Sequence, residues 1–250
     1  MGENRRKYFL NVFLVFVFFF VNTNLAMAHD LWLNVDNHYP KVGEKTTVKV
    51  LFGHNFPYYD ILITRDKLTG FSYLCPDGQI REVEKTWEDN KEKSKEGYGY
   101  KTGALAGDIT LDQKGTYVVA ASRKVKGDRE HVTSEKYGKS IIIAGKGNEM
   151  VSKPFGHRIE IVPLKNPSEI KPGDEFPVRV LFEGQPLSTY VYSTYAGYFS
   201  EDEPFPFFTK SNEDGVAYMK IPQAGIWLLV CNHKVDFSAS LTFKVAGEPK

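Results

Sequence analysis

The stretch that decides the fold is Lys41-Val-Gly-Glu44 followed by Val48-Lys-Val-Leu-Phe52, because it occurs twice. It returns 130 residues later as Lys171-Pro-Gly-Asp174 followed by Val178-Arg-Val-Leu-Phe182. In both copies a glycine turn leads into an alternating, β-branched segment, which is typical of a strand in an antiparallel sheet. The repeat therefore predicts two similar β-structured units.

The ends of the two units also correspond. Gln113-Lys-Gly-Thr-Tyr-Val-Val119 matches Gln223-Ala-Gly-Ile-Trp-Leu-Leu229, in each case a glycine turn before an aromatic strand. Short β-branched or aromatic runs bounded by Gly, Pro, Asn or Asp predict further strands. The predicted strands are Leu31–Val35, Thr46–Phe52, Asp60–Thr64, Thr116–Ser122, Ser140–Ala144, Arg158–Val162, Val178–Phe182, Val216–Ile221, Ile226–Cys231 and Ser238–Val245.

The fold class that follows is all-β. Residues 85–96 are charged and carry no capping signal, so they do not make a convincing helix. We predict two immunoglobulin-like or transthyretin-like β-sandwich domains. The first covers residues 29–145 and contains a long insert from Cys75 to about Gly107, and the second covers residues 156–246.

The N-terminus has the composition of a signal peptide. Arg5-Arg-Lys7 precedes an apolar run over residues 8–21, which is shorter than the roughly 20 residues that span a bilayer. Ala26-Met-Ala28 supplies the small residues that a signal peptidase accepts. We expect residues 1–28 to be cleaved off, leaving a periplasmic protein that begins at His29 and has no stable membrane span.

Charge and cysteine content limit the partners and the chemistry. The chain has a formal net charge of +1 and its leader carries +2, so the mature protein is near −1 and no nucleic-acid partner is expected. Two cysteines occur, Cys75 and Cys231, in different predicted domains. They either form a disulfide or stay as two buried thiols, and their separation favours the thiols.

The chain contains six histidines, and histidine is its most informative residue type. No nucleophile elbow, phosphate loop or dinucleotide fingerprint is present, so we do not expect an enzyme. Imidazole is a common ligand for Ni, Cu and Zn. After cleavage His29 offers both its α-amine and its ring, which together can chelate one ion. His38 and His131 lie in polar surroundings and are expected to be solvated.

Three other histidines are candidate companions of His29. His54 follows a predicted strand in Phe52-Gly-His-Asn-Phe56, His157 heads the alternating run His157-Arg-Ile-Glu-Ile161, and His233 follows the Trp227 strand. Taken singly, each has the alternative role of a capping or exposed polar residue. We predict a site for a divalent transition metal made by His29 and His54, completed by His157 or His233. Asp30 and Glu160 are candidates for carboxylates that orient the imidazoles.

Several motifs together resemble one family. They are Ala28-His-Asp-Leu-Trp-Leu33, Phe52-Gly-His54, Gly156-His-Arg-Ile-Glu-Ile-Val-Pro-Leu-Lys-Asn-Pro167, Asp214-Gly215 and Gly225-Ile-Trp227. The chain is similar in these segments to the DUF4198 family of exported bacterial proteins, which is related to the periplasmic NikM-type components of nickel and cobalt uptake. The resemblance implies a periplasmic metal-binding role accessory to uptake, favours Ni or Co over Cu or Zn, and implies a membrane transporter as partner.

Two other functions fit the same residues. An N-terminal histidine with one further imidazole can form the histidine brace of a copper redox enzyme. Alternatively, the chain is a metal-free β-sandwich module for recognition or adhesion. In that case the aromatic segment Tyr190–Phe208 supplies the contact surface. The alternative role of this segment is a buried hairpin of the second sandwich.

Overall fold

The computed structural model describes residues 29–54, 56–58, 61–89, 102–126, 133–200, 203–234 and 236–247. The predicted leader lies outside these residues. Within them the chain forms strands and three short 3-10 helices, which are η1 (Arg65–Lys67), η2 (Glu149–Ser152) and η3 (Pro167–Glu169). The all-β prediction is therefore confirmed. No helix of the described ranges is long and apolar enough to cross a membrane.

The strands form three sheets. A four-stranded sheet has the order β1 (Asp30–Val35), β2 (Lys45–Gly53), β6 (Ala104–Thr110) and β5 (Thr86–Asp89). A second contains β11 (Gln185–Pro186), β10 (Glu175–Phe182) and β14 (Val216–Lys220), with β9 (Ile159–Pro163) also paired to β10. The eight-stranded sheet has the order β13 (Phe207–Lys210), β12 (Tyr190–Tyr195), β15 (Gly225–His233), β16 (Phe237–Val245), β8 (Thr133–Ala144), β7 (Gly115–Lys126), β3 (Gly70–Leu74) and β4 (Ile80–Glu82).

The sequence repeat is also a structural repeat. Before β2, the Lys41 amide donates a hydrogen bond of 2.9 Å to the Glu44 carboxylate. Before β10, the Lys171 amide donates one of 3.0 Å to the Asp174 carboxylate. In each turn the acidic side chain accepts the bond from the residue three places earlier, so the same sequence pattern gives the same local geometry.

The glycine of each turn has the same conformation. Gly43 has φ +90° and Gly173 has φ +99°, in the left-handed region that favours glycine. Each glycine amide donates a hydrogen bond of 2.7 Å to a carbonyl, that of Leu111 in the first unit and that of Ile221 in the second. Each turn is thereby fastened to the chain just after the strand that pairs with β2 or β10.

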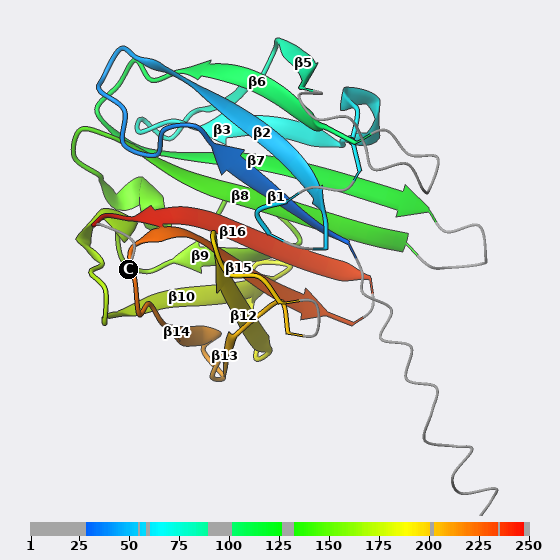
Figure 1. Cartoon of the computed structure of the whole chain (residues 1–250), viewed down its shortest axis with the longest axis vertical. Coiled ribbons are helices and arrows are strands. Elements are labelled where there is room, and N and C mark those ends of the chain that lie inside the picture. Colours follow the sequence, from blue (N-terminus) through cyan, green and yellow to red (C-terminus); the bar gives the residue numbers. More distant parts are fainter. Residues whose placement is uncertain are drawn as a thin grey trace, which may run out of the picture.

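The two units share the eight-stranded sheet. β8 belongs to the first predicted unit and β16 to the second, and they pair in parallel from Glu135 opposite Phe237 to Ser140 opposite Thr242. Figure 1 shows the red β16 running beside the green β8, with β2 and β6 on one side of this sheet and β9 and β10 on the other. The arrangement has three layers. The division into domains over residues 29–145 and 156–246 stays a prediction.

Alternation along the shared strands fills two cores. In β7, Tyr117 and Val119 pack into the core under the β1-β2-β6-β5 sheet, whereas Val118 packs into the core under β9 and β10. In β8, Ile142 joins the first core and Ile141 the second. Since successive side chains of a strand point to opposite faces, this sheet contributes to both sandwiches at once.

Some local predictions were wrong. Residues 61–64 form no strand. Leu62 and Ile63 are buried as part of a loop, and their apolar character gave the wrong prediction of a strand. Strands β3 and β6 were not predicted, since glycine, alanine and aspartate among their residues weaken the β signal. β12 and β13 form the hairpin that was the alternative role of the Tyr190–Phe208 segment. The segment expected to be irregular contains β4, β5 and β6. Cys75 and Cys231 are buried free thiols, which agrees with the favoured alternative.

Candidate metal centre

His29 and His54 lie next to each other at one end of the β1–β2 ladder. The last pair of this ladder is Asp30 opposite Gly53, so one further step places His29 opposite His54. Opposed residues of an antiparallel pair point to the same side of the sheet. Their ring centroids are 3.7 Å apart and the ring planes are tilted by 46°. The structure thus brings together two of the four candidate histidines.

The pair lies at the open end of the first sandwich. By alternation His29 shares a face with Leu31, and His54 shares a face with Phe52, and both of these apolar residues belong to the first core. The two histidines are half-buried. The Phe52 ring stacks on His29 with centroids 5.1 Å apart and planes within 9°. The imidazoles therefore rest against the core while part of their surface stays accessible to solvent.

Two groups of opposite charge, the half-buried Asp30 and the buried Lys136, lie beside this site. Burial raises the pKa of Asp30 to about 6, against the opposing effects of Lys136 and His54. Lys136 in β8 donates a hydrogen bond of 3.4 Å to Ser238, and burial lowers the pKa of its ammonium group. Above about pH 6 the Asp30 carboxylate is ionised, so it places a negative charge beside the two histidines.

His157 lies elsewhere, on the opposite face of the eight-stranded sheet. Its ring packs against Tyr137, with centroids 4.7 Å apart, and against Phe155, with centroids 5.0 Å apart. Burial, helped by the nearby Lys139 ammonium, lowers the pKa of His157 to about 4, so the ring is neutral at pH 7. The packing contacts place His157 among aromatic side chains of the second sandwich.

Glu160, in the same motif, forms an ion pair in the core. The Lys139 ammonium lies 2.7 Å from its carboxylate, and both side chains are 2% exposed. Glu160 also accepts hydrogen bonds from the amides of Phe155 at 2.9 Å and Gly156 at 3.1 Å. These contacts hold the start of β9 against β8. The carboxylate expected to orient an imidazole is thus engaged with an ammonium and two backbone amides.

The remaining histidines have separate surroundings. His233 ends β15, and its half-buried ring packs against Phe182 with centroids 4.4 Å apart. His38 was expected to be solvated, which is wrong: it is 2% exposed and its Nδ1 lies 2.8 Å from the Ile141 carbonyl oxygen. Burial lowers the pKa of His38 to about 4. His131 lies outside the described residues.

The donor groups at His29 and His54 can be compared with the ligands that metal ions prefer. Among the described residues no three His, Cys, Asp or Glu side chains are grouped to hold an ion. The pair supplies two imidazoles, and cleavage after Ala28 would add the α-amine of His29, which is not a side chain. Three nitrogens from two residues suit a borderline transition metal and not Ca²⁺ or Mg²⁺, which prefer oxygen.

Sequence reasoning missed the contribution of Phe52 and Arg123 to this site. The Arg123 guanidinium of β7 lies 5.0 Å from the centroid of the Phe52 ring, which in turn stacks on His29. The adjacency of Phe52 to Gly-His54 was visible in the sequence. The approach of Arg123 was not, because it depends on how the two sheets pack.

Comparison with solved structures gives only weak similarities. The D0-D1 domain of intimin has a TM-score of 0.24 and 13% identity, and the match covers 88% of this chain and 100% of that one. A DUF4785 family protein from Legionella pneumophila has a TM-score of 0.30 and 11% identity, covering 89% and 57%. Murine CEACAM1b has a TM-score of 0.23 and 10% identity, covering 87% and 99%. TM-scores this low do not establish that the structures are related.

Comparison by sequence is more informative. No curated protein matches the chain significantly. The sequence model described as "Domain of unknown function (DUF4198)" matches residues 26–235, which include both strands of the His29–His54 pair and most of the second sandwich. The match covers most of the chain, and the protein therefore belongs to the DUF4198 family.

Proposed function

We propose that this protein, once its leader is cleaved after Ala28, binds a divalent transition-metal ion in the periplasm. The ligands are the α-amine and ring of His29 and the ring of His54. The observation that carries the proposal is the 3.7 Å separation of the two imidazole centroids at the start of β1. His157 and His233 are left out, because their rings pack against aromatic residues at other places.

The chemistry of these groups supports metal binding at neutral pH. An α-amine has a pKa near ~8, so a fraction is already deprotonated and a metal ion would displace the remaining protons. Partial exposure of both rings allows the ion to enter and leave. We propose a carrier that is accessory to metal uptake and hands its ion to a membrane transporter, and not an enzyme. Nickel or cobalt is favoured by the NikM-type resemblance.

Isothermal titration of the processed protein against Ni²⁺, Co²⁺, Cu²⁺ and Zn²⁺ tests the proposal. A matched form carries one extra residue before His29, which removes the free α-amine at that position. We expect the extra residue to weaken binding by more than about 100-fold, because even changes outside the ligand shell cost about 10- to 100-fold. His54→Ala should weaken it similarly, and His233→Ala should leave it unchanged. Equal affinity of the processed and extended forms would contradict the proposed ligand set.

The copper brace is the second candidate function, and it is favoured because His29 and His54 are the two described histidines that pair. Two imidazoles and one amine leave coordination positions open, and Cu²⁺ binds nitrogen ligands more tightly than Ni²⁺ or Co²⁺. Reductant-dependent oxygen consumption by the copper-loaded protein would distinguish an enzyme from a carrier. A carrier should show no more consumption than the same concentration of the His54→Ala variant.

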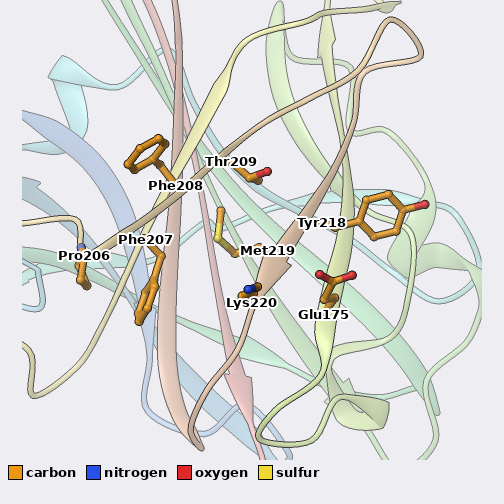
Figure 2. Close-up of a pocket in the computed structure, with 8 residues that line it drawn as sticks. All are labelled: Glu175, Pro206, Phe207, Phe208, Thr209, Tyr218, Met219 and Lys220. Atoms are coloured by element: carbon orange, nitrogen blue, oxygen red, sulfur yellow. The ribbon is translucent and has the colours of Figure 1, made fainter.

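A metal-free recognition module is the third candidate function. Strands β12 and β13 pair as an antiparallel hairpin, from Tyr190 opposite Lys210 to Ser193 opposite Phe207, and Phe208 is 66% exposed. Figure 2 shows Phe208 and Phe207 on one side of a hollow and Tyr218 on the other, with Glu175 and Lys220 between them. The hollow has a volume of about 470 Å³. Co-sedimentation with isolated cell-wall polysaccharide, reduced by Phe208→Ala and unaffected by His29→Ala with His54→Ala, would favour this function.

A further inference from the structure

The orientation of His29 needs an explanation, because cleavage would make it the terminal residue. The β1–β2 ladder ends at Asp30, so no backbone pair of that ladder includes His29. The first residues of a domain are commonly less ordered than the strands that follow them. Chelation by the amine and ring of one residue nevertheless requires a defined ring orientation, and ordering it only on binding would weaken the affinity.

An aromatic stack provides such an orientation. The Phe52 ring lies parallel to the His29 ring within 9°, at 5.1 Å between centroids. Phe52 sits opposite Leu31 in the ladder, so His29 and Phe52 are diagonal neighbours on one face of the sheet. Phe52 is only 6% exposed, which means that its own ring is fixed by the core.

The eight-stranded sheet also contacts the Phe52 ring, through Arg123. Arg123 is on β7 of the eight-stranded sheet, and its guanidinium carbon lies 5.0 Å from the centroid of Phe52. A guanidinium over an aromatic face is attracted by the negative face of the ring. The Phe52 ring is therefore held from β2 through the backbone and from β7 through Arg123, while it stacks on His29.

We propose that Phe52 is a positioning residue that pre-orders the His29 ring for metal binding, with Arg123 holding Phe52 in place. This inference rests on the proposed function of His29 and His54. Aromatic pairs of this kind strengthen an interaction enough to change an equilibrium constant by about two- to twelve-fold. Loss of the Phe52 ring should therefore weaken metal affinity by that factor without removing any ligand.

The test compares four variants of the processed protein with the wild type, the fourth being Arg123→Met. Phe52→Leu removes the ring, and Phe52→Tyr keeps it. Phe71→Leu is the matched control, since Phe71 is a fully buried residue of the same core and has no ring contact with His29. Affinities for Ni²⁺ and Cu²⁺ are measured by titration. The ring-proton shifts of His29 are measured by NMR without metal, because the stacked Phe52 ring displaces them.

We expect Phe52→Leu to weaken binding about two- to twelve-fold and to move the His29 ring protons toward their random-coil positions. Phe52→Tyr and Phe71→Leu should retain wild-type affinity. Arg123→Met, which keeps the aliphatic stem, should give a smaller change in both measurements. If the wild type binds metal and Phe52→Leu binds it as tightly as Phe71→Leu does, this inference is overturned and the proposed function still stands. Absence of metal binding by the wild type would overturn both.

Discussion

The Lys139–Glu160 ion pair gives the most direct prediction about the Gly156-His157-Arg-Ile-Glu160 motif. Its contacts indicate that the motif holds β9 against β8. Replacing Lys139 with Met keeps most of the side-chain volume but leaves the Glu160 carboxylate, 2% exposed, without its ammonium partner. Breaking a buried ion pair by removing one member costs about 3–5 kcal/mol of unfolding free energy. For a chain of this size that lowers Tm by about 6–20 °C.

A double-mutant cycle shows whether the loss comes from the unpaired charge. Lys139→Met with Glu160→Gln removes both charges. The single Gln oxygen can still accept one of the two hydrogen bonds that Phe155 and Gly156 donate, because these go to different carboxylate oxygens. We expect this pair of substitutions to recover part of the stability, since neutral replacements of a buried ion pair are often tolerated. The measurement is urea unfolding followed by tryptophan fluorescence.

The pH dependence of the single variant provides a second check. In the wild type the Lys139 ammonium helps to hold the pKa of Glu160 below its usual value, against the effect of burial. Without Lys139, burial raises that pKa above the unfolded value, so the variant gains stability relative to wild type as the pH falls and Glu160 takes up a proton. A Lys139→Met cost below about 1 kcal/mol, or a cost independent of pH, would refute the reasoning.

Other predictions concern pH, the repeated turns and the metal site. The pKa of His38 falls from 6.5 to about 4 on burial, so its neutral form contributes about 3 kcal/mol above pH 6.5 that is lost as the pH falls toward 4. His38→Asn should flatten the decline of unfolding free energy between pH 7 and pH 4.5, and an unchanged slope would exclude His38 as its source. Gly43→Ala and Gly173→Ala should each cost about 1–2 kcal/mol, because both glycines have positive φ and open space around an added Cβ. A large difference between the Tm values of these two variants would contradict the equivalence of the turns. In the same titration, His54→Ala should weaken metal affinity and His157→Ala should leave it unchanged. An equal loss of affinity in both variants would return His157 to the ligand set.

Most strands of the fold follow from local sequence, because each has its own alternation and its own bounding turns. The repeated Lys-x-Gly-acid turn was predictive for the same reason: the acidic side chain and the glycine act within four residues. The prediction of a strand failed at Leu62 and Ile63, because these apolar side chains are buried in a loop. It also failed at β3 and β6, whose glycine and alanine residues weaken the local β signal.

The candidate site was only partly visible in the sequence. Histidines at strand ends mark positions where a ligand can lie, but the face to which each points depends on register. Asp30 opposite Gly53 places His29 beside His54, whereas His157 heads a strand whose neighbours enclose it with aromatic rings. Local sequence cannot distinguish these two situations, because both read as histidine next to an alternating strand.

By itself, the sequence determined the all-β class, the twofold repeat and the residue types able to bind a metal, since these depend on composition and short-range pattern. Only the tertiary structure decided that the two sandwiches share one sheet, through the parallel pairing of β8 with β16, about a hundred residues apart in the chain. It also decided that two histidines meet while Glu160 pairs with Lys139. Contacts at this sequence separation form through the packing of whole sheets, and no local pattern encodes them.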